Sequence, residues 1–219
     1  MTKKVFVLQY DDMYEQEVRN VLDPERSVKT ERYKVMITSF LSYLHDLVYL
    51  LGGIILVLLL LFRVVVVSGP SMNSTLIDGD YLILLNNTIY RNPQQGDIIV
   101  ASKKSYDNGT PIVKRIIATE GQIVDIDFTA GIVYVDGKQL VEAYTYTPTN
   151  RYEGVEFPLT VAPGCVFVMG DNRNISKDSR SPEIGLIDTR EILGKAIFLM
   201  LPGTNGTVGR QYYRIGALN

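Results

Sequence analysis

Ser71 and Lys114 are two residues whose types and local settings suit nucleophilic chemistry. Ser71 lies in a turn-rich stretch between two apolar runs. In the run PIVKRIIA, strand alternation places Lys114 on the same face as Ile112, Ile116 and Ala118. Burial among such side chains disfavours the ammonium form and lowers the pKa of a lysine. A neutral lysine can then take the proton of a serine hydroxyl and activate it, whereas a lysine that reaches solvent or pairs with a carboxylate would have no such role.

A third polar cluster, GDNRNISKDSR, spans Gly170–Arg180 directly after the apolar run CVFVM. We expect four of its charged residues to stabilise one another as ion pairs: Asp171, Arg173, Asp178 and Arg180. Ser176 would then be free to orient a neighbouring lysine amine. Arg115, next to Lys114, suits a permanent ion pair because a guanidinium does not lose its proton.

The composition leaves few other catalytic groups. Among 219 residues there is one cysteine, Cys165, and one histidine, His45. This excludes an intrachain disulfide framework and multi-cysteine or histidine-rich metal sites. Phosphate-binding glycine loops, EF-hand spacing and the HExxH pattern do not occur, so we predict no metal and no cofactor. The 22 Lys and Arg against 24 Asp and Glu lack the basic excess of nucleic-acid-binding proteins, so no nucleic-acid partner is expected.

A long apolar segment lies upstream of these residues. The run Leu47–Phe62 is followed by Arg63 and by Val64–Val67. About 20 apolar residues cross a bilayer, and the run lacks the polar stripe of a helix that covers a core. We therefore predict a transmembrane anchor over 47–67, with Tyr33–His45 as a helix leading into it. A cleavable signal peptide is disfavoured because the run begins too late and is too long.

Basic residues near the span predict its orientation. Three of them precede it: Lys29, Arg32 and Lys34. Arg63 is the only further basic residue before Arg91. The positive-inside rule then predicts a cytoplasmic segment over 1–46 and an extracytoplasmic domain over 68–219, in a single-pass protein of the cell membrane. His45 would lie on the cytoplasmic edge, out of reach of that domain.

Beyond the anchor, the pattern changes to short β-type runs separated by turn residues. These runs are VVVVSG, DYLILLNN, DIIVAS, PIVKRIIAT, QIVDIDF, GIVYVDGKQLV, CVFVMGDN and AIFLML. Within the sixth run, Asp136-Gly137 separates two alternating arms and predicts a tight hairpin. We expect a mainly β fold, with an antiparallel β-sheet catalytic domain large enough for its own core.

Three patterns in this order behind one N-terminal anchor resemble the type I signal peptidases. They are Ser71-Met72, Lys114-Arg115 and GDNRxxSxDSR over Gly170–Arg180. GDYLIL over Gly79–Leu84 and GDIIV over Gly96–Val100 also match β-strand boxes of that family. The resemblance covers roughly residues 64–197. Members of the family are membrane-bound serine proteases with a Ser–Lys dyad.

The resemblance implies a role for each matching position. Ser71 would be the nucleophile, Lys114 the general base, and Ser176 the serine that hydrogen-bonds the lysine. Met72 matches the hydrophobic neighbour of the nucleophile. Gly69 matches the position two residues before it, whose backbone N–H would join that of Ser71 in the oxyanion hole. Four residues would hold the site together by ion pairing: Arg115, Asp171, Asp178 and Arg180.

The same resemblance implies the substrate and the surroundings. The fold would have two antiparallel β-sheet regions and an apolar surface resting on the lipid bilayer. Substrates would be preproteins that carry signal peptides, cleaved without a cofactor, and the secretion translocon is a further candidate partner. The chain departs from the family pattern at Ser74, in place of proline, and at Glu120 and Gln122, where GLPGD is usual. These departures concern loop rigidity and substrate range, so a specialised paralogue remains an alternative.

Three other hypotheses compete with a signal peptidase. The first is a non-enzymatic membrane protein that assists pilus or surface-protein assembly; the retained Ser71, Lys114 and Ser176 disfavour it. The second is a sortase, which needs a cysteine and a histidine on one side of the membrane, whereas His45 is expected on the other side. The third is a self-cleaving Ser–Lys regulator, which would carry a DNA-binding domain that this sequence lacks.

Overall fold

The computed structural model describes residues 18, 21, 24–204 and 209–218, which fall into two compact units, Met1–Val57 and Leu58–Asn219. Helix α2 (Pro24–Leu61) contains Tyr33–His45, in line with the predicted lead-in helix. Its part Glu31–Leu61, of mean hydropathy 2.4, is long and apolar enough to span a membrane, and no other described helix is. Most of the predicted cytoplasmic segment before residue 24 lies outside the described residues.

The helix ends earlier than the predicted span. It stops at Leu61, and the residues expected to extend the span form strand β1 (Phe62–Val66). The same valines begin the predicted β-type run VVVVSG, and the structure confirms that strand over residues 64–66. β-Branched valines lose rotamer freedom in a helix and pack well in a sheet, which explains why the helix gives way to a strand here. β1 pairs antiparallel with β2 (Tyr81–Asn86). Asn86 Nδ2 donates to the Leu60 carbonyl at 3.1 Å, which satisfies one of the carbonyl groups left unpaired at the helix end.

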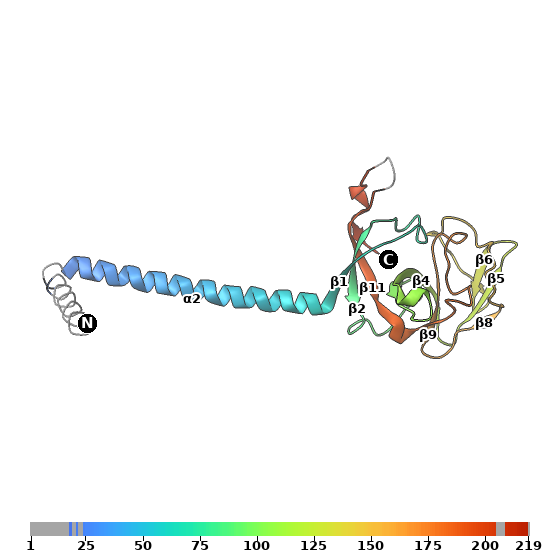
Figure 1. Cartoon of the computed structure of the whole chain (residues 1–219), viewed down its shortest axis with the longest axis horizontal. Helices are drawn as coiled ribbons and strands as arrows, with labels where there is room; N and C mark the ends of the chain where they lie inside the picture. The colour runs from blue at the N-terminus through green and yellow to red at the C-terminus, as the bar shows by residue number, and fades with distance from the viewer. Residues whose placement is uncertain (1–17, 19–20, 22–23, 205–208, 219) are drawn as a thin grey trace, which may run out of the picture. The chain divides into compact units, whose positions relative to one another are not determined.

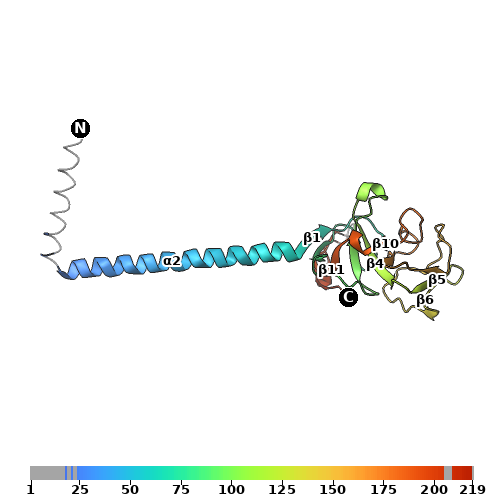
Figure 2. The same cartoon turned by 90° about the horizontal axis from the view of Figure 1, so that it is seen from below.

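Two antiparallel sheets form the second unit, and its mainly β class is as predicted. The larger has the order β1-β2-β11-β3-β4-β9-β10, with β12 also paired to β11; the smaller has the order β7-β6-β5-β8. Within this unit, β5 and β6 lie at the opposite end from β1 and β11 in both Figure 1 and Figure 2. The remaining strands are β3 (Ile98–Ala101), β4 (Ile112–Thr119), β5 (Ile123–Asp127), β6 (Ile132–Val135), β7 (Lys138–Gln139), β8 (Leu159–Thr160), β9 (Cys165–Met169), β10 (Ile187–Asp188), β11 (Ile192–Leu201) and β12 (Gly216–Ala217). Short 3₁₀ helices cover Asp107–Gly109, Thr189–Glu191 and Tyr212–Arg214.

Strand β4, which carries Lys114, departs from simple alternation. Its pairing with β9 shifts register between Ile116 and Ala118, so it contains a β-bulge. Ile112 and Ile116 pack with one hydrophobic cluster, but Ile117 and Ala118 both pack into another. The expectation that Ala118 shares the face of Ile116 is therefore wrong, because the bulge adds one residue to the strand.

The predicted hairpin is present. Asp136 and Gly137 join β6 to β7, with φ angles of 51° and 73°. Both residues are in the left-handed region, as the favoured two-residue turn requires.

The segment between β1 and β2 is fixed from two sides. Met72 and Leu76 are fully buried in a cluster with Leu82 and Leu84 of β2. At the far end of the segment, the buried Asp80 accepts hydrogen bonds from both terminal nitrogens of Arg214, at 2.9 and 2.7 Å, and from the Gly203 N–H at 2.7 Å. Arg214 Nη2 also donates to the Thr75 carbonyl at 3.1 Å. The position of Ser71 is thus set by core packing and by a buried ion pair.

Candidate active site

Ser71 and Lys114 meet although 43 residues separate them in the chain. Lys114 Nζ donates to Ser71 Oγ at 2.9 Å and to the Val113 carbonyl at 3.0 Å. Lys114 is only 4% exposed. Its burial lowers the pKa of the amine from 10.5 to about 8, against the opposing effect of the carboxylates of Asp178, Asp171 and Glu153. A neutral amine in contact with a serine hydroxyl is thus accessible near neutral pH.

The cluster Gly170–Arg180 lies directly against the Ser71 segment. The Asn172 N–H donates to the Ser71 carbonyl and Asn172 Nδ2 donates to the Pro70 carbonyl, both at 3.1 Å. A Cβ atom on Gly170 would lie within 3.0 Å of the Ser71 carbonyl oxygen and of Ser176 Oγ. Gly170 is therefore required by the close approach of two chain segments.

Arg115 and Asp171 form a buried, two-pronged ion pair. Arg115 Nε and Nη2 donate to the two oxygens of Asp171 at 2.9 and 2.8 Å, and the side chains are 3% and 0% exposed. Thr75 Oγ1 donates to the same carboxylate at 2.5 Å. The guanidinium of Arg115 also lies over the ring of Tyr144, 4.0 Å from its centre. This pair joins β4, the Ser71 segment and the polar cluster.

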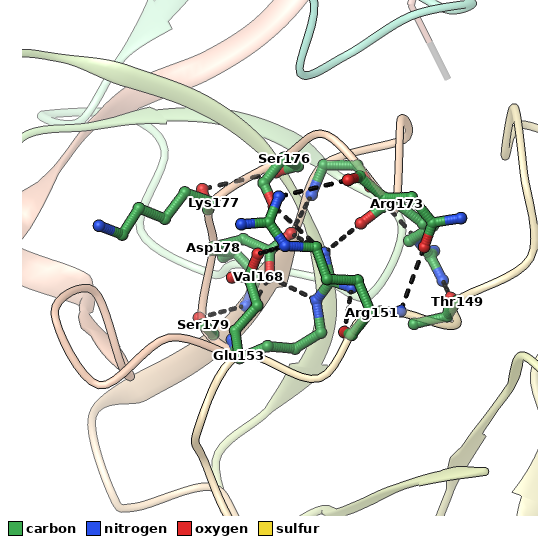
Figure 3. A network of polar contacts seen from close by, with 12 residues as sticks. Thr149, Arg151, Glu153, Val168, Arg173, Ser176, Lys177, Asp178 and Ser179 are labelled. Atoms are coloured by element: carbon green, nitrogen blue, oxygen red, sulfur yellow. Dashed lines mark hydrogen bonds and ion pairs between the residues drawn. The ribbon is translucent and has the colours of Figure 1, made fainter. Parts of the chain in front are cut away.

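Asp178 and Arg180 form a second buried pair. Arg180 Nε and Nη2 donate to the Asp178 carboxylate at 2.8 and 2.9 Å, and the Gly170 N–H donates to it at 3.0 Å. Arg180 Nη2 also donates to the Arg173 carbonyl at 2.6 Å. Figure 3 shows the network of polar contacts around Arg173, Ser176 and Asp178.

The other two charges of the cluster find partners outside it. Arg173 binds the carboxylate of Glu142 and donates to Thr149 Oγ1 at 2.7 Å, while Asp171 pairs with Arg115. The expectation that the four charges pair among themselves is therefore correct only for Asp178 and Arg180. Asp171 and Arg173 instead join the segment to Arg115 of β4 and to Glu142.

Ser176 is fully buried beside Gly170. Its hydroxyl donates to the Lys177 carbonyl at 3.4 Å. Within the described residues, the hydrogen bonds of the Lys114 amine go to Ser71 and Val113. A bond between Ser176 and Lys114 stays a prediction.

Gly69 has a φ of +85° in the turn before Ser71. Its N–H donates to Asp78 Oδ1 at 2.8 Å, so the group expected to join the oxyanion hole is engaged with a carboxylate in this structure. Among the described residues, no hydrogen bond uses the N–H of Ser71. Over the same residues, no three His, Cys, Asp or Glu side chains converge on a site for a metal ion.

Several residues of this site were not singled out by the sequence. Gly170 and Asn172 lie inside the GDNR pattern, and Thr75 lies inside SMNST, so a signal for them existed in the motifs. Glu142 and Glu153 lie in irregular segments without any pattern. Only the folded structure reveals those two.

Comparison with known proteins decides the family. The family model described as signal peptidase, peptidase S26, matches residues 40–201. The chain belongs to this family. Among its members, a probable signal peptidase I-1 of Synechocystis sp. is 37% identical over 166 residues, covering 71% of this chain and 81% of that protein. A signal peptidase I of Bacillus licheniformis is 33% identical over 150 residues, covering 65% and 78%.

A crystal structure of a signal peptidase I from Enterococcus faecalis is also similar to this chain. It has 30% sequence identity and a TM-score of 0.39, and the match covers 48% of this chain and 97% of that one. The resemblance inferred from the sequence motifs is confirmed by the family match, and with it the assignment to the serine endopeptidases.

Proposed function

We propose that this chain removes signal peptides from exported preproteins, with Ser71 as the nucleophile and Lys114 as the general base. The observation that carries the proposal is the 2.9 Å contact between Ser71 Oγ and the buried amine of Lys114. Membership of a family of signal peptidases supports the substrate class. The arrangement is the serine–lysine variant of nucleophile activation.

The reaction follows from this geometry. When the amine of Lys114 is neutral, the contact reverses and the Ser71 hydroxyl donates to Nζ. As Oγ attacks the scissile carbonyl carbon, its proton passes to Lys114. The tetrahedral intermediate then expels the new amino terminus, which takes that proton from the lysine ammonium. A water molecule next attacks the acyl group on Ser71 and gives its proton to Lys114. Release of the cleaved signal peptide restores the hydroxyl and the neutral amine.

The negative oxygen of the intermediate needs a preorganised hydrogen-bond donor. We assign this role to the N–H of Ser71, because the N–H of Gly69 is bound by Asp78. Gly69 serves instead as the left-handed turn that aims the backbone of Ser71, a conformation that glycine adopts without steric cost.

The chain would act at a membrane. Helix α2 has the length and hydropathy of a membrane anchor. The basic residues that precede its apolar part favour a cytoplasmic N-terminus and an exported catalytic domain. The lipid bilayer and the secretion translocon are then its expected surroundings.

The decisive experiment uses the full chain in detergent and a preprotein with alanine at the −3 and −1 positions of its cleavage site. Ser71→Ala and Lys114→Met should each lose most of the activity, and the double variant should be little worse, because the two groups act as a unit. Lys114→Arg should also be inactive, since a guanidinium cannot accept the proton.

Matched controls are available on an exposed loop. Ser105→Ala and Lys104→Met should cleave like the unmodified chain, because both side chains face solvent. Substantial cleavage by either dyad variant would refute the residue roles. No cleavage by the unmodified chain would favour the non-enzymatic alternative.

A further inference from the structure

Glu153 is a buried carboxylate that the proposed mechanism does not use. Its side chain is only 4% exposed, and its ion-pair partner is Arg151, whose Nε lies 3.1 Å from Oε1. The Arg151 side chain is itself 50% exposed. Neither oxygen of Glu153 has a well-aligned hydrogen bond within the described residues. A carboxylate in such a place is costly unless it is fully paired, so its presence calls for a physical reason.

The segment that carries Glu153 packs against the Asp178–Arg180 pair. Arg180 Nη1 donates to the Arg151 carbonyl at 3.1 Å, and the Val155 N–H donates to the Arg180 carbonyl at 3.0 Å. Figure 3 shows Glu153 beside Asp178. Burial and the charge of Asp178 raise the pKa of Glu153, against the opposing effects of Arg180, Arg151 and the Asp178 peptide N–H. Glu153 therefore belongs to the same buried polar network as Asp178 and Arg180.

Three carboxylates act on the Lys114 amine: those of Asp178, Asp171 and Glu153. Arg180 grips Asp178 with two nitrogens, and Arg115 does the same to Asp171. Each of these charges is thus neutralised at contact distance. Within the described residues, Glu153 has one ion pair, to an arginine that is half in solvent, and it lies near the Asp178 peptide N–H. Its effect on the amine is the smallest of the three, and it is the one that no arginine binds with two nitrogens. Arg180 acts on the amine in the opposite direction.

We propose that Glu153 is a positioning residue of this peptidase, a buried charge packed against the Asp178–Arg180 pair that helps to hold the Lys114 amine ready to accept the Ser71 proton. This inference rests on the proposed function of Lys114 as the base. The amine must be neutral to begin the reaction, yet it must bind the Ser71 proton firmly enough to take it. Desolvation alone favours the neutral form of the Lys114 amine. The charge of Glu153 acts in the opposite direction and restores part of the amine's affinity for the Ser71 proton.

The test is the pH dependence of kcat/KM for Glu153→Gln in the full chain, with the same preprotein. The acidic limb should move to lower pH by about half a unit to one unit, because one nearby negative charge is removed. One unit below the wild-type limb, the rate should rise about three- to five-fold. Glu153→Met, which also lacks the charge, should shift the limb in the same direction. Glu156→Gln is the matched control, since Glu156 is exposed and accepts from Tyr152 at 3.0 Å.

Each outcome bears on the proposal. A limb at the wild-type position in both Glu153 variants would overturn it, and so would a failure of both to fold, because the role would then be structural. An equal shift in Glu156→Gln would also overturn it, as an effect of overall charge. A failure of the proposed function is distinct: the unmodified enzyme would then lack an acidic limb, or Ser71→Ala would retain activity.

Discussion

Replacement of Gly170 by alanine tests whether the close contact between the polar cluster and the Ser71 segment positions the nucleophile. The added Cβ would lie within 3.0 Å of the Ser71 carbonyl oxygen and of Ser176 Oγ. Carbon and oxygen atoms ordinarily approach to about 3.3–3.6 Å, so the segments must separate by at least about 0.3–0.6 Å. Ser71 is tied to this cluster through the Asn172 N–H, so its hydroxyl would move relative to Lys114.

Catalytic groups must be held to about 0.5 Å, and an error of about 1 Å can cost about 100-fold in rate. We therefore expect Gly170→Ala to lower kcat/KM by about 10- to 100-fold, and to lower the free energy of unfolding by about 1–3 kcal/mol from overpacking. The assay is cleavage of the alanine-bearing preprotein by the full chain in detergent, with thermal unfolding measured in parallel to count only folded enzyme.

Gly216→Ala is the matched control. A Cβ at Gly216 meets no atom within 4 Å and its φ is outside the left-handed region, so activity and stability should both stay close to wild type. The reasoning fails if Gly170→Ala folds and keeps kcat/KM within about two-fold of wild type.

Four further outcomes are expected. For the unmodified chain, kcat/KM should rise with pH through an acidic limb near pH 8, the pKa to which burial lowers Lys114; a flat profile down to pH 5 would exclude the lysine as base. Because that pKa is lower in the folded than in the unfolded chain, the free energy of unfolding should increase from about pH 8 to about pH 10.5. Lys114→Met, although inactive in cleavage, should have a free energy of unfolding at pH 7 that is higher by up to about 3 kcal/mol, and that free energy should not increase between pH 8 and pH 10.5. Arg115→Met should lose about 3–5 kcal/mol in denaturant titrations, since it leaves the fully buried Asp171 without its cation; a loss below about 1 kcal/mol would contradict this. Protease added outside right-side-out vesicles should reach a C-terminal epitope and spare a tag at Met1, and the reverse pattern would overturn the orientation.

Periodicity and turn chemistry were sufficient to predict the longer strands, since these are local properties of the chain. The two-residue strands β8, β10 and β12 were not predicted, because they are too short to show a periodic pattern. The hairpin at Asp136-Gly137 follows from two positions that must both adopt positive φ. The end of the helix and the bulge at Ile117 were missed for a different reason. A valine run suits both a membrane span and a strand, and a bulge depends on the partner strand β9.

In the candidate site, too, local features could be predicted from the sequence and long-range contacts could not. Burial of Lys114 could be predicted from its neighbours in the strand, and its pairing with Ser71 from the resemblance of the motifs to those of type I signal peptidases. The partner of Arg173 could not be found, because Glu142 is 31 residues away in an irregular segment. The hydrogen bond from the Gly69 N–H to Asp78 likewise depends on how the loop folds back, which no spacing rule describes.

The buried pair of Asp80 and Arg214 constrains when the active site can assemble during synthesis of the chain. The two residues are 134 positions apart, so the ribosome makes the serine segment long before the arginine that holds its far end. Until Arg214 emerges, burial of Asp80 would leave a carboxylate without its cation, and a half-made chain avoids that arrangement. Contacts of such long range also form late in folding. The nascent chain should therefore carry an unassembled site, and proteolytic activity should appear only after Arg214 is available to pair with Asp80.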